Sequence, residues 1–440
     1  MIGGLSPEQR LVIIGSHTVC SLEEKTLITE LSDQCTDAAN VVRIALVQKT
    51  FPLFYHNLSH CARKQQGLFS REVEHDLRKA ALQHWVPALH RIRASIQSIT
   101  ALFHAEGIDH AFLRGVPFAE RFYGQAQFRY CEDIDLLVPD VARHDAAQAL
   151  LGAGYEFVEP EAVREARAEF VGQIEFIHRS TNSCLDLNWK MTGNAGIGSV
   201  TFNMAEVWHR ARRVSKCLVE LSTSDVLLDA ARHCTHGHDF VGSFLRSCSD
   251  LERIFSVGWH EIDWTYVKRQ LAASECLNAF SMLVRVYNGF SVLRNAQPVC
   301  IPMLSKNVED AESFSFSRVI VIPFIGGQSS GALQESAGRY AACISKFWTL
   351  DRYSRFLRIS RMLAFPTKHE RCLLLRTFGH MSRPRFSTML CLLLIAAMIP
   401  AIFGGMLIHI FFSLADLSRQ GKKWLYGCGP SLIEDREDPL

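Results

Sequence analysis

Residues 129–138 read RYCEDIDLLV, and this stretch decides the fold expected for the chain. Asp133 and Asp135 stand one residue apart at the start of an apolar run. In a β-strand alternate side chains point to the same face, so the two carboxylates would share one face and Ile134 and Leu136 the other. A short aliphatic run that ends at a proline favours a buried strand over a helix. The sequence therefore predicts a strand that begins with two neighbouring acids.

Two carboxylates this close repel each other unless a cation lies between them. Oxygen ligands suit Mg²⁺ or Mn²⁺, so we interpret Asp133 and Asp135 as a metal-binding pair. The alternative is an exposed strand end whose acids are only solvated. A third acid, Asp186, lies in CLDLNWK at 184–190, where the same alternation predicts a second strand. If the two strands pair at the usual spacing of about 4.8 Å, three carboxylates meet and can hold two metal ions.

The stretch upstream of the acids suggests a place for phosphates. AFLRGVPFAERFYG at 111–124 reads as a strand that ends in Arg114 and Gly115, followed by an amphipathic helix. A glycine permits close approach of the backbone to a ligand, and the amides at a helix N-terminus bind phosphate. We therefore expect a triphosphate to lie against this turn.

The remaining pattern predicts an α+β protein in which a small mixed β-sheet is flanked by N-terminal helices and a C-terminal helical bundle. Strand-like runs occupy residues 110–114, 133–138, 155–159, 173–179 and 184–189. The expected regions are an N-terminal helical region (1–106), a core with the sheet (107–215), a helical bundle (216–300), a linker or loop region (301–338) and a basic helical C-terminal region (339–440).

Composition places the chain among globular proteins, because 48% of its residues are hydrophobic and 21% are charged. This balance excludes wholesale disorder. The fourteen cysteines form no C-x-x-C pair, and the N-terminal residues lack the features of a secretory signal. The sequence therefore predicts a cytoplasmic location.

The net charge of +2 hides a basic C-terminal region. Residues 339–423 hold 14 Lys or Arg against 3 Asp or Glu. Within that region, residues 386–415 carry no charged side chain and are long enough to cross a bilayer, although Pro400 interrupts them. Two interpretations stay open: a hairpin in or on a membrane, and an apolar helix buried in the fold. The first would associate a cytoplasmic protein with a membrane surface.

A histidine-rich stretch, RHCTHGHDF, invites a zinc interpretation. Its candidate ligands are His233, Cys234, His236 and His238. No second ligand pair follows at a usual zinc spacing, and the stretch ends an apolar helical pattern. We therefore favour a structural or substrate-facing role for these side chains.

The segment LRGVPFAERFYGQAQFRYCEDIDLLV, residues 113–138, resembles the signature of a bacterial nucleotidyltransferase family distantly akin to polymerase beta. That signature has L-K-G, then a Tyr-Gly pair, then R-x-x-x-D-I-D-L-L-V. The matching positions here are Gly115, Tyr123, Gly124, Arg129 and 133–138. Shorter matches, FPLFYHNL near residue 51 and FPTKHE near residue 365 among them, extend the resemblance over residues 40–370.

The resemblance implies a catalytic and metal-binding role for Asp133, Asp135 and Asp186, and the last acid would also help to deprotonate the acceptor. It implies that Gly115 approaches the nucleotide phosphates, and that Arg129 either contacts phosphate or braces the acids.

Two positions depart from the family pattern. Arg114 replaces the usual Lys, which keeps the charge and the expected phosphate contact but changes its geometry. Asn188 stands where the family prefers His, which weakens any proton-shuttle role there.

The implied function is Mg²⁺-dependent transfer of a nucleoside monophosphate from an NTP to an unidentified acceptor, which could be a small molecule, glycan or peptide. The basic cluster lies far from the acids in the sequence, which argues against nucleic acid as a partner. Two alternatives stay open. One is a non-catalytic protein that keeps the fold to bind a nucleotide or a partner. The other is a glycosyltransferase, which would require a parallel, doubly wound half upstream of the acids.

Overall fold

The computed structural model describes the chain in five stretches and at eight single positions. The stretches are residues 5–18, 20–62, 68–191, 202–236 and 244–274, and the single positions lie between 277 and 301. All of them belong to the first of two compact units, Met1–Phe356.

Four helices open the described chain and pack on one another. They are α1 (Pro7–Gly15), α2 (Leu22–Gln34), α3 (Ala38–Val47) and α4 (Phe51–Ala62). The first two begin with capping boxes, in which Ser6 pairs with Gln9 and Ser21 with Glu24. Each pair satisfies two backbone amides that a helix start leaves without partners, so these boundaries follow from local sequence.

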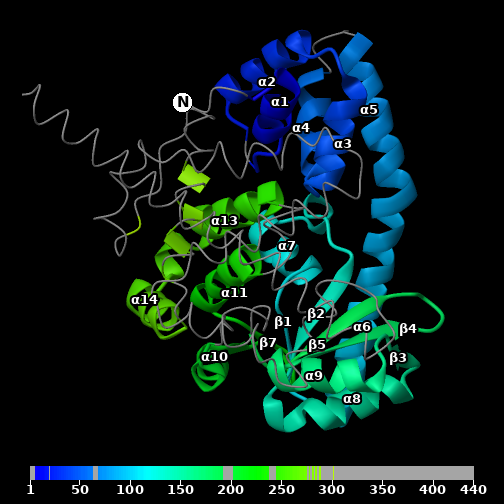
Figure 1. Cartoon of the computed structure of the whole chain (residues 1–440), viewed down its shortest axis with the longest axis vertical. Helices are drawn as coiled ribbons and strands as arrows, with labels where there is room; N and C mark the ends of the chain where they lie inside the picture. The colour runs from blue at the N-terminus through cyan, green and yellow to red at the C-terminus, as the bar shows by residue number, and fades with distance from the viewer. Residues whose placement is uncertain are drawn as a thin grey trace, which may run out of the picture. The chain divides into compact units, whose positions relative to one another are not determined.

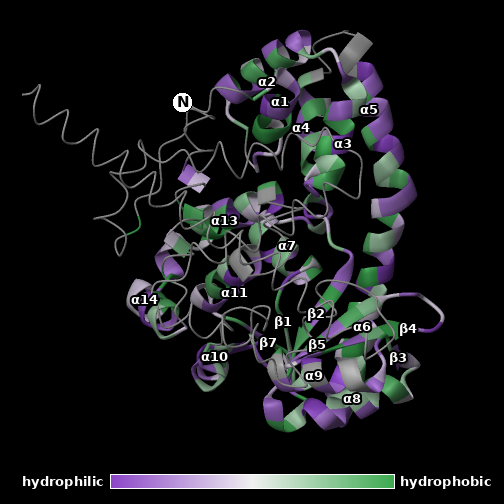
Figure 2. Cartoon of the chain, viewed as in Figure 1, coloured by the Kyte–Doolittle hydropathy of each residue, from purple (hydrophilic) through white to green (hydrophobic). Residues whose placement is uncertain are grey.

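A long helical stretch follows. It consists of α5 (Leu68–Ala80), a π-helical turn (Ala81–Trp85) and α6 (Val86–Glu106). The wider turn comes just before Pro87, whose ring would clash with the carbonyl group one turn earlier in a regular helix. Gly107 ends α6 in the left-handed conformation, with φ of 70°. Figure 1 shows α5 beside the N-terminal helices and α6 beside the sheet. Hydrophilic and hydrophobic residues alternate along α5 and α6 (Figure 2).

Five strands form one mixed sheet. In spatial order they are β1 (Ala111–Phe112), β2 (Asp133–Leu137), β5 (Cys184–Asn188), β4 (Gln173–His178) and β3 (Tyr155–Phe157). β2 and β5 are parallel, and the other neighbours are antiparallel. Each strand falls within one of the five predicted runs, because the alternation of side chains marks a half-buried strand.

One face of the sheet is apolar and lies in the core. Ile134 and Leu136 on β2, Leu185 and Leu187 on β5 and Phe176 on β4 are all buried. Helix α6 contacts β2, and α8 (Arg143–Gly152) contacts β5 and β3. Since side chains alternate, the residues between these apolar positions lie on the opposite face, which carries the acids.

The remaining elements connect the strands or follow the sheet. They are α7 (Val116–Tyr123), η2 (Ala126–Phe128), η3 (Asp140–Ala142), α9 (Glu161–Phe170), α10 (Met204–Arg210), β6 (Arg212–Arg213), β7 (Val219–Glu220), α11 (Thr223–His236), α13 (Phe244–Gly258), η4 (Trp259–Glu261) and α14 (Trp264–Ala273). Helix α11 packs against both α13 and α14, as expected for the helical bundle.

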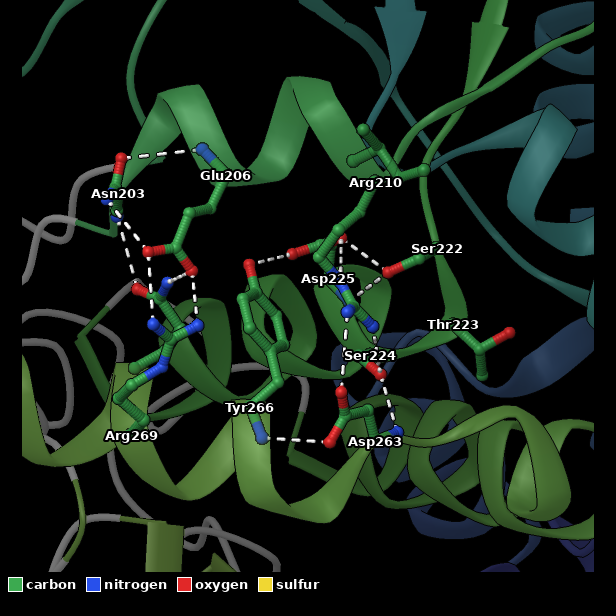
Figure 3. A network of polar contacts seen from close by, with 12 residues as sticks. Asn203, Glu206, Arg210, Ser222, Thr223, Ser224, Asp225, Asp263, Tyr266 and Arg269 are labelled. Carbon is green, nitrogen blue, oxygen red and sulfur yellow. Dashed lines mark hydrogen bonds and ion pairs between the residues drawn. The ribbon is translucent and has the colours of Figure 1, made fainter.

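A polar network joins α10, α11 and α14 (Figure 3). The Tyr266 hydroxyl donates to Asp225 at 2.6 Å, and the Arg210 guanidinium lies 4.0 Å from the centre of the Tyr266 ring. Arg210 also pairs with Asp263 at 3.4 Å and donates to Ser224 at 3.3 Å. Burial raises the pKa of Asp225. These contacts link α10, α11 and α14 through residues that lie far in the sequence from Asp133 and Asp135.

The predicted α+β class is confirmed: the described chain is mainly helical and contains a five-stranded mixed sheet. The finer division into regions stays a prediction. Apart from residue 301, the linker at 301–338 and the C-terminal region with residues 386–415 lie outside the described residues. Among the helices that the structure describes, none is long and apolar enough to cross a membrane.

Candidate active site

The acids predicted as metal ligands lie on two neighbouring strands. β2 and β5 run parallel, with Asp135 opposite Asp186 and Asp133 opposite Cys184. Residues opposite each other share a face, and Asp133 shares that face with Asp135 by alternation. The two strands thus meet the condition set by the sequence analysis, and their pairing brings the three aspartates to one face of the sheet at a strand spacing of about 4.8 Å.

A fourth acid lies in the same row. Glu175 on β4 is opposite Asp186 in the antiparallel pair. Arg167, on α9, pairs with Glu175 and also with Glu159 at 3.1 Å, so it offsets part of the charge of the two glutamates. Glu175 was not among the predicted site residues. The alternation of polar and apolar residues in QIEFIH could have placed it on the polar face, but its position opposite Asp186 follows only from the strand register.

Gly115 forms the turn between β1 and α7. Its φ of +79° is one that residues with a side chain rarely adopt. A β-carbon at this position would lie 3.8 Å from the carbonyl oxygen of Asp133, so the turn passes beside the start of β2. Helix α7 begins at the next residue, Val116. The turn predicted to hold phosphate and the strand predicted to hold metal are therefore neighbours.

The guanidinium group of Arg114 bridges two carboxylates. Its Nε and Nη2 donate to the two oxygens of Asp135 at 3.2 and 2.7 Å, and its Nη1 donates to Asp229 at 2.8 Å. Asp229, on α11, also accepts hydrogen bonds from Arg232 at 2.6 and 3.1 Å. Burial alone would raise the pKa of Asp229, but the two arginines lower it to about 2. Asp229 was not among the predicted site residues. Its occurrence as an acid within an apolar helical pattern could have marked it as a residue with a buried partner.

In the part of the chain that the structure describes, the other two aspartates have no cation hydrogen-bonded to them. Among the residues described, none donates a hydrogen bond to the carboxylate of Asp133 or Asp186. Asp133 is exposed at the strand end, yet surrounding protein partly desolvates it. This desolvation and the charge of Asp135 raise the pKa of Asp133. Burial, together with Asp135, Asp133 and Glu175, raises the pKa of Asp186 well above its ordinary value. The cluster is therefore short of positive charge.

This donor set suits Mg²⁺ or Mn²⁺ in its chemistry, since carboxylate oxygens are the ligands that these ions prefer. In the described ranges, however, no three His, Cys, Asp or Glu side chains are gathered as a metal site. The geometry offers a reason, because both oxygens of Asp135 accept hydrogen bonds from Arg114. A metal ion bound by the three aspartates would therefore compete with the guanidinium for the oxygens of Asp135.

Arg129, predicted either to contact phosphate or to brace the acids, is buried. Only 4% of its surface is exposed, and its Nε and Nη2 both donate to Asp250 on α13 at 2.8 Å. The Tyr123 hydroxyl donates to the same carboxylate at 2.8 Å. These hydrogen bonds hold Arg129 against α13, and its phosphate-contacting or bracing role stays a prediction. The sequence analysis missed Asp250 as the partner.

Two further basic side chains influence the acids. Arg246 on α13 and His233 on α11 both oppose the rise in the pKa of Asp133. His233 was one of the candidate zinc ligands, and the side chains of the other three, Cys234, His236 and His238, lie outside the described residues. Helices of the C-terminal bundle thus contribute positive charge to the acidic face.

Aspartates at the start of two parallel strands, beside a glycine turn that opens a helix, form a site suited to nucleotidyl transfer. The chain belongs to the uncharacterised nucleotidyltransferase family, whose model matches residues 34–290, more than half of its length. The predicted resemblance is confirmed to that extent. No curated protein and no solved structure matches the chain.

The closeness of Asp186 to the other acids predicts how the stability of the fold depends on pH. A raised pKa means that the folded protein binds the Asp186 proton more tightly than the unfolded chain does, so ionisation of Asp186 destabilises the fold as the pH rises above 3.8. At pH 7 and without metal, Asp186→Asn should therefore increase the free energy of unfolding by on the order of 1 kcal/mol. The gain should shrink as the pH is lowered towards 3.8.

Thermal unfolding in EDTA across this pH range measures the effect. Asp140→Asn is a suitable control, because Asp140 is exposed and lies beyond the other end of β2. A variant at position 186 that is less stable than the wild type at pH 7 would contradict the prediction.

Proposed function

We propose that the chain transfers a nucleoside monophosphate from an NTP to a hydroxyl-bearing acceptor and releases pyrophosphate. The observation that carries this proposal is the register that sets Asp135 opposite Asp186, with the Gly115 turn beside Asp133. Membership of a nucleotidyltransferase family supports the reaction type. The dependence on metal, the acceptor and the more distant kinship with polymerase beta are parts of the proposal.

In this proposal Asp133, Asp135 and Asp186 hold Mg²⁺, and Mn²⁺ would bind through the same oxygens. Bound there, the metal would neutralise the charge that develops on the attacking and leaving oxygens of an in-line displacement at phosphorus. Among the described residues none donates a hydrogen bond to the carboxylate of Asp133 or Asp186, and the neighbouring acids raise the pKa of both; these observations support the assignment.

The chain's own residues position the reactants. In the proposal the triphosphate lies against the Gly115 turn, which passes beside the start of β2. The acceptor hydroxyl gives its proton to the Asp186 carboxylate as its oxygen bonds to the α-phosphorus. The bond from that phosphorus to the oxygen bridging the α- and β-phosphates breaks, and pyrophosphate leaves. Most of the rate enhancement in such a transfer comes from positioning and electrostatic stabilisation.

The fold argues against the glycosyltransferase alternative. A glycosyltransferase would need a parallel, doubly wound half upstream of the acids, and the described chain before β1 is helical. We therefore set that alternative aside. The acceptor remains a small molecule, glycan or peptide in our proposal. A cytoplasmic location and contact with a membrane surface stay predictions.

Pyrophosphate release tests the proposal. The full chain is incubated with Mg²⁺, each of the four NTPs labelled on the α-phosphate, and a cell extract as the source of acceptors. We expect pyrophosphate to form with at least one NTP, EDTA to abolish it, and mass spectrometry to find the label on an acceptor. If labelled Mg²⁺–NTP binds but neither pyrophosphate nor a labelled product appears, the non-catalytic alternative is supported instead.

A further inference from the structure

Arg114 lies between two acids that come from different parts of the fold. Asp135 belongs to the sheet, and Asp229 belongs to α11, almost one hundred residues later. The three side chains are largely buried, at 13%, 8% and 1% exposed respectively. A guanidinium has five donors in a rigid fork, so one arginine can satisfy both carboxylates at once. Arg114 donates two hydrogen bonds to Asp135 and one to Asp229.

The contact of Arg114 with Asp135 is more easily displaced than its contact with Asp229. Asp135 is a candidate metal ligand, and a metal ion and a guanidinium would compete for the electron pairs of the same carboxylate. Asp229 lies on the buried face of a helix and is held from its other side by Arg232. With a pKa of about 2, Asp229 also stays ionised at any physiological pH. A cation that binds Asp135 would therefore weaken the contact to Asp135 and leave the contact to Asp229 in place.

We propose that Asp229 is a positioning residue, which holds Arg114 at the site when a metal–nucleotide complex displaces the guanidinium from Asp135. This inference rests on the proposed function and extends it. The Nη1 contact to Asp229 acts as a pivot, and Nε and Nη2, released from Asp135, turn to the phosphates beside the adjacent Gly115. The ligand class recognised by Arg114 is thus the polyphosphate of a nucleotide.

The arrangement has an electrostatic consequence. In the metal-free protein Arg114 neutralises part of the acidic cluster, and Asp229 draws some of that charge away from Asp135. Without the charge of Asp229, the guanidinium would pair with Asp135 alone and compete more strongly with a cation. Without Arg114, no described residue would donate a hydrogen bond to the Asp135 carboxylate and so compete with the cation. The two substitutions should therefore change metal affinity in opposite directions.

The test uses Mn²⁺ alone, added to the full chain without nucleotide and followed by electron paramagnetic resonance. We expect Arg114→Gln to bind Mn²⁺ about tenfold more tightly than the wild type and Asp229→Asn to bind it several-fold more weakly, within the range usual for groups that contact metal ligands. The control is Asp225→Asn, one turn earlier on α11, where a fully buried aspartate contacts Tyr266 and Arg210 instead (Figure 3). Its Mn²⁺ affinity should not change.

Nucleotide binding gives the second measurement. Titration with Mn²⁺–ATP, and with the preferred NTP once known, should show that Arg114→Gln and Asp229→Asn both weaken nucleotide binding about tenfold. In turnover, KM should rise for both variants more than kcat falls. A residue that only supported the fold would not produce opposite metal shifts together with equal nucleotide shifts.

Several outcomes would overturn the inference: Asp229→Asn binding Mn²⁺ as the wild type does, Asp225→Asn shifting by the same amount, or no Mn²⁺ binding by any variant. Should Asp229→Asn fail to fold, unchanged Mn²⁺ affinity in Arg114→Gln, which alters a partly exposed side chain, would overturn it as well. The titrations need no turnover. A wild type that binds Mn²⁺ and ATP but releases no pyrophosphate would therefore remove the proposed function and leave the exchange at Arg114 in place.

Discussion

Replacing Asp133 with Asn should lower the rate of nucleotidyl transfer by on the order of 10³-fold, because metal ions supply several kcal/mol of transition-state stabilisation and each 1.4 kcal/mol is a factor of ten. Asp133 is the acid most able to bind a cation without rearrangement. It stands at the exposed end of β2, and no described residue donates a hydrogen bond to its carboxylate. An amide at this position keeps the volume and loses the charge.

The same features predict that the fold survives this substitution. No ion pair of Asp133 is broken, and a like-charge contact with Asp135 is relieved, so the thermal stability of the metal-free protein should be equal to or above that of the wild type. Steady-state pyrophosphate release, with circular dichroism on the same samples, measures both effects. Asp140→Asn again provides the matched control and should keep full activity. A rate for Asp133→Asn within about threefold of the wild type would remove metal binding at this acid from the proposal.

The second large effect concerns the buried ion pair between Arg129 and Asp250. Asp250→Ala should lower the free energy of unfolding by about 3–5 kcal/mol, because it leaves the buried guanidinium of Arg129 without its counter-charge. The Tyr123 hydroxyl would lose its acceptor in the same change. Urea unfolding followed by tryptophan fluorescence measures this loss. Since Arg129 lies four residues before Asp133, we also expect catalytic activity to fall in conditions where the variant remains folded.

An exposed pair of the same kind is the control. Asp109 accepts two hydrogen bonds from Arg213, at 2.8 and 2.9 Å, so this pair is bidentate as well, through Nη1 and Nη2 instead of Nε and Nη2. Both partners are exposed, so water and salt screen the interaction, and Asp109→Ala should change stability little. Equal losses for the Asp250 and Asp109 variants would show that burial does not govern the strength of the Arg129 pair.

Local sequence was sufficient for much of the fold. Alternation in DIDLL and CLDLN placed the acids on one side of each strand, and both strands occur where it predicted them. Ser6 with Gln9 marks the start of α1 through a capping box, an interaction that spans only three residues. The sequence placed a glycine between a strand and a helix, and the structure gives Gly115 a φ that residues with side chains rarely adopt. All of these signals act between residues that are close in the chain.

The composition of the site depended on contacts that no local pattern contains. The position of Asp186 opposite Asp135 was conditional on strand pairing, and Glu175 was missed because its neighbour is set by the register of β4 against β5. Arg129 was recognised, but its partner Asp250 comes from a helix 121 residues later.

The sequence by itself determined which residues could carry charge at the start of β2 and which face of the strand would present them. The tertiary structure decided which charges meet there, and it alone paired Arg114 with both Asp135 and Asp229. The physical reason is that periodicity and capping arise from neighbours along the chain, whereas the pairing of buried charges depends on how strands and helices from distant segments pack.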